Sequence, residues 1–151
     1  MTRASLLALY LMSALTVGSA QAAQANHITA THAWIRLLPG DLPAAGYVTL
    51  QNNDTTTATI ASVHTTAYAS AMIHQSTQEA DGMSHMTMVD HLAIPAHGAV
   101  SLSPNGYHLM LEHASHPLKA GDSVNIALSF ADGSQLPVSF LVRPANAVDT
   151  N

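Results

Sequence analysis

The chain is built largely from short segments in which apolar and β-branched residues alternate with polar ones. These segments lie at 28–35, 44–50, 58–65, 70–77, 83–89, 100–102, 107–112, 124–130 and 138–142. Turn-forming clusters of Pro, Gly, Asn and Asp separate most of them, at 39–43, 52–54, 80–82, 104–106, 119–122 and 131–134. No stretch after the N-terminal region has the convincing 3.6-residue periodicity of an amphipathic helix. The pattern predicts an all-β chain folded as an antiparallel sandwich or barrel.

Residues 1–22 have the composition of a secretory signal peptide. Arg3 precedes an apolar stretch at 4–17, and small residues follow, with Ala20 and Ala22 at the positions that signal cleavage. Ala25 offers a later cleavage position. The apolar stretch is shorter than the roughly 20 residues that span a bilayer, and no cysteine follows it to carry a lipid. We therefore expect a soluble periplasmic protein without membrane insertion after cleavage, with an uncleaved anchor as the alternative.

The remaining residues have the size of one domain, expected at 26–144, with a frayed tail at 145–151. The formal charge of the chain is −5, and removal of Arg3 would make it −6. Such a balance argues against binding to nucleic acid or to an anionic membrane. The chain has no cysteine, so its stability must come from an apolar core without disulfides. The same absence excludes a blue-copper electron carrier, whose site needs a thiolate.

Methionine and histidine side chains are interleaved between Met72 and Met110. The methionines lie at 72, 83, 86, 88 and 110, and the histidines at 74, 85, 91, 97 and 108. Thioether sulfur is a soft ligand and imidazole a borderline one, so together they suit copper, above all Cu(I). A single Met is more often a core filler and a single His more often a surface residue, so only the combination points to copper.

Three pairs of these residues are spaced two apart, namely Met72 with His74, Met86 with Met88, and His108 with Met110. Successive side chains of a strand point to opposite faces, so the two members of each pair share a face. Leu109, between His108 and Met110, points to the other face. The spacing predicts a metal site built from three strands.

The spacing and its flanking sequence resemble the PCu(A)C family of periplasmic copper chaperones. The signature of that family is a His, ten residues, a Met, twenty-one residues and then His-x-Met. His108 and Met110 match its last part, and Met86 lies twenty-one intervening residues before His108. His74 takes the first position, with eleven residues rather than ten before Met86. The likeness extends over nearly the whole mature chain, through H-A-W-I-R, A-A-G-Y-V-T-L-Q-N, I-P-A-H-G and N-G-Y-H-L-M-L.

The resemblance implies a cupredoxin-like β-sandwich that binds Cu(I) through His74, Met86, His108 and Met110. It also implies delivery of copper to respiratory oxidase assembly, notably the CuA centre. The acceptor would be oxidase subunit II or a thiol-bearing assembly factor. We expect a monomer and no enzymatic activity, because the chain lacks the common hydrolase, zinc-protease and phosphate-loop motifs. The alternatives are a periplasmic copper buffer, a structural or adhesion sandwich and, last, a metal-dependent oxidoreductase.

Several residues have a second interpretation. His85 in place of Met86 would restore the ten-residue gap but break the twenty-one-residue gap, so we prefer Met86 and place the extra residue in a hairpin loop at 78–82. Trp34 is expected to anchor the core. A looser group could hold zinc or Cu(II), at Glu112, His113 and His116.

Overall fold

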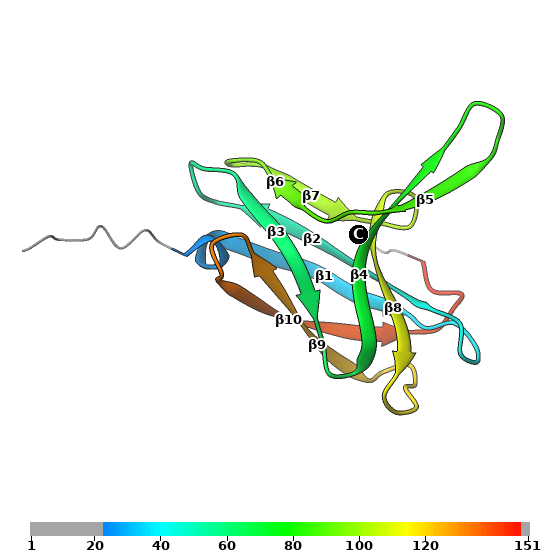
Figure 1. Cartoon of the computed structure of the whole chain (residues 1–151). Helices are drawn as coiled ribbons and strands as arrows, with labels where there is room; N and C mark the ends of the chain where they lie inside the picture. Colours follow the sequence, from blue (N-terminus) through cyan, green and yellow to red (C-terminus); the bar gives the residue numbers. More distant parts are fainter. Residues whose placement is uncertain (1–22, 149–151) are drawn as a thin grey trace, which may run out of the picture.

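The computed structural model describes residues 23–148, which form one 10-stranded sheet that curls around an apolar core (Figure 1). No α-helix occurs in this range, which begins with the 3-10 helix η1 (Gln24–His27). The strands are β1 (Ile28–Arg36), β2 (Ala44–Asn52), β3 (Ala58–His64), β4 (Tyr68–Gln78), β5 (Ser84–Met88), β6 (Leu92–Ile94), β7 (Ala99–Leu102), β8 (Tyr107–Ala114), β9 (Ser123–Phe130) and β10 (Gln135–Arg143). The predicted all-β sandwich is confirmed. Only β6 has no counterpart among the predicted segments.

The strands follow the order β5-β4-β8-β2-β1-β10-β9-β3-β6, and β7 pairs with β2 outside this path. All pairs are antiparallel except β1 with β10. β3 and β4 lie near opposite ends of this order, yet a short turn joins them. That turn brings the two halves of the sheet together as the layers of a sandwich (Figure 1).

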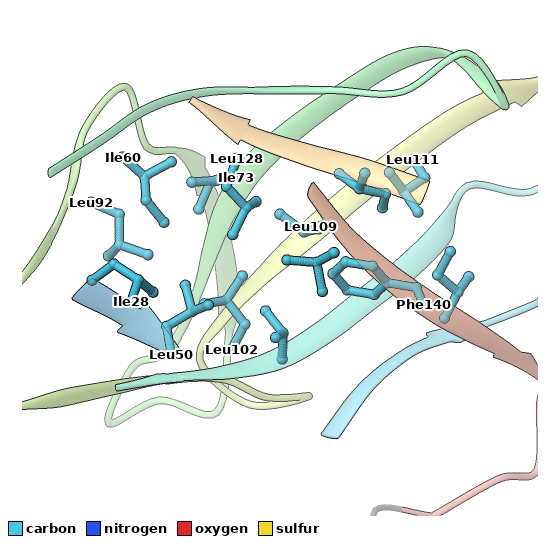
Figure 2. Close-up of a cluster of buried hydrophobic side chains, with 14 of the residues drawn as sticks. Ile28, Leu50, Ile60, Ile73, Leu92, Leu102, Leu109, Leu111, Leu128 and Phe140 are labelled. Atoms are coloured by element: carbon cyan, nitrogen blue, oxygen red, sulfur yellow. The ribbon is translucent and has the colours of Figure 1, made fainter. Parts of the chain in front are cut away.

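The core lies between the layers and consists of the side chains that point inward, at alternate positions along the strands (Figure 2). Leu109, Leu111 and Phe140 are completely buried there. Burial of one such side chain contributes about 1.5–3 kcal/mol. Gly46 faces Leu109 so closely that a Cβ atom at this position would lie 3.0 Å from the Cβ atom of Leu109. Gly46 therefore serves packing, because it lets β2 and β8 approach each other closely.

Trp34 is buried, but it lies outside this core. Ile35 next to it packs inward, so Trp34 faces the outer side of the sheet, where its ring lies 4.7 Å from that of Tyr47. The guanidinium groups of Arg36 and Arg143 lie over the indole, with Cζ 5.4 and 5.1 Å from the ring centroid. The predicted core anchor is thus the centre of a separate outer cluster, because the parity of β1 assigns the inward position to Ile35.

Residues before 26 take part in the contacts of the β domain. Ala25 is buried, and its N–H donates to Ser134 Oγ at 3.0 Å. The N–H of Gln24 donates to Asp132 Oδ2 at 2.7 Å, and its side-chain oxygen accepts from the N–H of Thr59 at 3.1 Å. Cleavage after Ala22 would keep these contacts, whereas cleavage after Ala25 would remove them. The predicted signal peptide, 1–22, and residues 149–151 of the predicted tail lie outside the described residues.

Candidate metal centre

The outer face of β4 and β8 carries two donor residues from each strand. In the antiparallel register, Met72 lies opposite Met110 and His74 opposite His108. Residues directly opposite each other in such a pair share a face, so all four side chains project on one side. Ile73 and Leu109 alternate with them and are buried in the core. Core burial of these two residues therefore fixes the outward direction of the donors.

His108 is nearly buried, with 6% of its surface exposed. Its Nδ1 atom lies 3.2 Å from the carbonyl oxygen of Gly106. A proton on Nδ1 makes this a hydrogen bond, and the same tautomer leaves the lone pair of Nε2 free. A metal-ligating imidazole needs this arrangement, since a hydrogen bond to one nitrogen orients the ring and presents the other to the metal.

His74 has a different environment. Its Nδ1 atom is buried and has no hydrogen-bond partner, which costs about 1–3 kcal/mol for a polar group. Its ring lies edge-on to that of His108, with centroids 6.1 Å apart. Burial lowers the pKa of His74, the neighbouring His108 lowers it further, and Glu112 partly opposes both effects. His74 therefore stays neutral to lower pH than an ordinary histidine, and a neutral imidazole is the form that binds a metal.

β5 adds methionines to the same face from the edge of the sheet. Met88 lies opposite His74, and Met86 lies opposite Ser76. Their exposed fractions are 62% and 52%, and Met83 in the adjoining turn is 58% exposed. Figure 1 shows the β4–β5 hairpin projecting beyond the body of the sandwich. Soft sulfur donors are thus held on an open edge hairpin next to the two less exposed imidazoles.

The register separates Met86 from Met88. Met86 is two residues farther from the His74 row than Met88, which corresponds to about 7 Å along a strand. As a ligand, Met86 would have to reach back toward the imidazoles with its flexible side chain. Met88 and Met72 lie nearer by register, although the sequence comparison with the PCu(A)C signature selects neither. The sequence feature that identifies Met72 and Met88 is their spacing of two residues from His74 and Met86, which places all four side chains on one face of the β4–β5 hairpin.

His85 lies on the other face of β5. It pairs with Thr77, and its Nε2 atom is 3.8 Å from Glu79 Oε1. The structure therefore does not bring it together with His74 and His108, and this orientation favours Met86 over the rival assignment. The turn that joins β4 to β5 includes Gly82, whose φ of +84° suits glycine, in the region expected to hold the extra residue.

The looser group at Glu112, His113 and His116 does not assemble a metal site. Within residues 23–148 there is no cluster of three or more His, Cys, Asp or Glu side chains that could hold a metal ion. The side chain of His116 instead lies 3.0 Å from the hydroxyl of Ser115. The possible zinc or Cu(II) site is therefore wrong, and the donor set on β4, β5 and β8 is distinguished by its thioethers.

No helix in residues 23–148 is long and apolar enough to cross a membrane. The profile of a family described as putative lipoprotein LpqE-like matches residues 28–142. A relative named putative lipoprotein Lxx21020, from Leifsonia xyli subsp. xyli, is 27% identical over 128 residues, covering 85% of this chain and 76% of that one. The residues that match the family, 28–142, correspond to β1 through β10.

Solved structures share the fold. The solution structure of Cu(I)-DR1885 from Deinococcus radiodurans is 34% identical, with a TM-score of 0.61, over 82% of this chain and 81% of that one. The apo PCuAC domain of PmoF2 is 20% identical, with a TM-score of 0.67, over 82% of this chain and 95% of that one. These likenesses confirm the predicted cupredoxin-like fold class.

Proposed function

We propose that this chain, which belongs to the LpqE-like family, is an exported PCu(A)C-type copper chaperone that holds Cu(I) on its outer face and passes it to another protein. The observation that most directly supports this proposal is the register of β4 and β8, in which one imidazole lies opposite the other and one thioether lies opposite the other. Neutral sulfur and nitrogen donors suit Cu(I) and leave the bound ion cationic. The 34% identity to a protein studied in its Cu(I) form supports the same cargo here.

The proposed ligands are His74, Met86, His108 and Met110. The free Nε2 of His108 and the unpartnered Nδ1 of His74 support the two imidazoles as ligands. Met110 lies two residues from His108 on the same strand face, and Met86 lies on β5 on that face, opposite Ser76. Met72 and Met88 lie on the same face and are available as additional sulfur donors.

The proposed delivery of copper follows from the modest strength with which neutral thioethers bind Cu(I). Thiolates bind Cu(I) more strongly than neutral thioethers, so an acceptor with reduced cysteines can take the ion by ligand exchange. The proposed acceptor is oxidase subunit II at its CuA centre, or a thiol-bearing assembly factor, in the periplasm. The open position of the β4–β5 hairpin gives such an acceptor direct access to the sulfur donors.

A competition titration with a Cu(I) chelator tests binding. We expect Met110→Leu to lower Cu(I) affinity by about tenfold or more, while the free energy of unfolding changes by less than about 1.5 kcal/mol because volume is conserved. Met83→Leu is the matched control, since Met83 lies in the turn and outside the proposed set. Equal affinity in the Met110→Leu variant and the unaltered protein would remove Met110 from the site.

Transfer to a reduced dithiol protein tests delivery. The Cu(I)-loaded protein should lose its ion to the dithiol acceptor faster than it releases the ion to a chelator of equal affinity. In a host with a copper-dependent oxidase, deletion of the gene should lower oxidase activity when copper is scarce, and added copper should restore it. A copper buffer would instead protect at high copper, and an adhesion protein would show no copper dependence.

A further inference from the structure

Two arginines lie side by side on the outer face of the sheet. Arg36 and Arg143 are direct partners in the parallel pairing of β1 with β10. Both guanidinium groups lie over the ring of Trp34, and that of Arg36 also lies 5.4 Å from the centroid of Tyr47. The buried indole therefore holds two positive charges next to each other, where they repel.

No carboxylate in residues 23–148 lies within ion-pair distance of either guanidinium, since the one such contact in that range is between His85 and Glu79. Arg36 donates from Nη2 to the carbonyl oxygen of Ala147 at 3.3 Å, and its buried Nε has no partner. Each guanidinium has five N–H donors, so apart from the buried Nε of Arg36 and its bond to Ala147, the donors of this pair have no partner within residues 23–148. Planar guanidinium groups bind carboxylates with two parallel hydrogen bonds, so the pair is suited to a carboxylate.

The arginine pair lies on the same cross-strand row as the proposed copper site. Met110 on β8 lies opposite Ala45 on β2, Ala45 lies opposite Arg36, and Arg36 lies opposite Arg143. Neighbouring strands are about 4.8 Å apart, so the backbones of Met110 and Arg36 are separated by about 10 Å. Only the small side chain of Ala45 lies between them.

A partner that reaches the copper ligands must also cover this pair. A typical protein interface buries about 800 Å² on each side, which corresponds to a radius of about 16 Å. An interface centred on Met110 therefore includes Arg36 and Arg143. The chain has a net charge of −5 and only four Lys and Arg residues, so this pair is a local positive patch on an otherwise acidic protein.

We propose that Arg36 and Arg143 bind carboxylates of an acidic partner protein that exchanges copper with the neighbouring His/Met site. This proposal rests on the proposed copper-carrier function and adds a property of the partner, which carries Asp or Glu side chains roughly 10–15 Å from its own copper ligand. The patch attracts and orients that partner, and complementary charge of this kind raises the rate of association more than the affinity.

The first experiment compares two synthetic reduced dithiol peptides, one with aspartates flanking its cysteine pair and one with asparagines in their place. With the full-length Cu(I)-loaded protein at low salt, we expect transfer to the aspartate peptide to be about tenfold faster. This preference should disappear in Arg143→Gln and persist in Lys119→Gln, which removes an equal charge in the turn before β9. Equal rates for the two peptides, or an undiminished preference in Arg143→Gln, would overturn the proposal.

A second experiment needs no copper and so separates this proposal from the proposed function. Trp34 is the sole tryptophan of the chain and lies beneath both guanidinium groups, so its fluorescence reports on the pair. A cysteine-free aspartate peptide should change the fluorescence of the metal-free protein, and the asparagine peptide should not. Thermal unfolding checks that Arg143→Gln remains folded.

If the fluorescence of Trp34 responds to the aspartate peptide only after Asp149→Asn, a carboxylate of the chain's own tail occupies the arginines and the proposal is wrong. Failure of Cu(I) binding with a preserved fluorescence response would instead reject the carrier function.

Discussion

The donor-bearing face has two regions that differ in how the fold holds them. On β4 and β8, the donors alternate with fully packed core residues, and His108 is only 6% exposed. On β5, every residue is exposed, and Met86 and Met88 are held by the hairpin alone. The comparison indicates a preorganised half on β4 and β8, which carries both imidazoles and two of the thioethers, and an adaptable half on β5, which carries thioethers alone. Such an arrangement suits a site that must both hold copper and release it.

The largest expected effect comes from the preorganised half. His108→Ala should lower Cu(I) affinity by more than about 100-fold, because loss of even an outer-shell partner of a metal ligand typically costs 10–100-fold. Chelator competition measures this effect, and His85→Ala, on the other face of β5, is the matched control. A similar loss in both variants would show that His85 also contributes and that the division into faces is incorrect.

The packing beneath β8, in the preorganised half, can be changed without removing a proposed ligand. Gly46→Ala would place a Cβ atom 3.0 Å from Leu109 Cβ, on the strand that carries His108 and Met110. We expect unfolding to become easier by about 1–3 kcal/mol, as for other overpacked core positions. Thermal denaturation of the metal-free protein measures the change, with Gly106→Ala as a control whose added Cβ meets only Ser103 Oγ at 3.6 Å. Equal stability of the two variants would mean that β2 and β8 adjust freely.

The adaptable half on β5 is tested by replacing each of its two methionines with leucine. Met86→Leu should lower Cu(I) affinity by about tenfold, the effect of losing roughly 1.4 kcal/mol. Met88→Leu should leave the affinity nearly unchanged. Both residues are exposed, so the free energy of unfolding should change by less than about 0.5 kcal/mol in each variant. The opposite result would assign the ligand to Met88, which lies directly opposite His74, and would make the register rather than the spacing decisive.

The smallest expected effect is a pH dependence of the metal-free protein. The pKa of His74 is lowered by burial and by His108, so the unfolded chain binds a proton near pH 6.5 that the folded chain does not. The contribution of His74 is therefore present above about pH 6.5 and is lost as the pH falls toward its folded pKa. Denaturant unfolding between pH 7.5 and 5 should show a smaller decrease in stability for His74→Gln than for the unaltered protein. An identical decrease would place the cause in other histidines.

The alternation of residue types was sufficient to locate most strands before any contact was known. It also assigned the partners within each pair, such as His108 and Met110, to one face. It predicted the burial of Trp34 but not the side of the sheet on which Trp34 is buried, since a buried aromatic residue has the same sequence signal on either side. The outer position of Trp34 depends on Tyr47, Arg36 and Arg143, which come from three different strands.

The sequence by itself determined the chemistry of the candidate site, because thioethers, imidazoles and the absence of cysteine are properties of composition. It also determined the parity of each donor pair, because successive side chains of any strand alternate in direction. Only the tertiary structure decided that His74 lies opposite both His108 and Met88, and that Met110 lies on one row with Arg36 and Arg143. These registers join residues far apart in the chain, and they are selected by the burial of Ile73, Leu109 and Leu111 in a common core, which no local pattern contains.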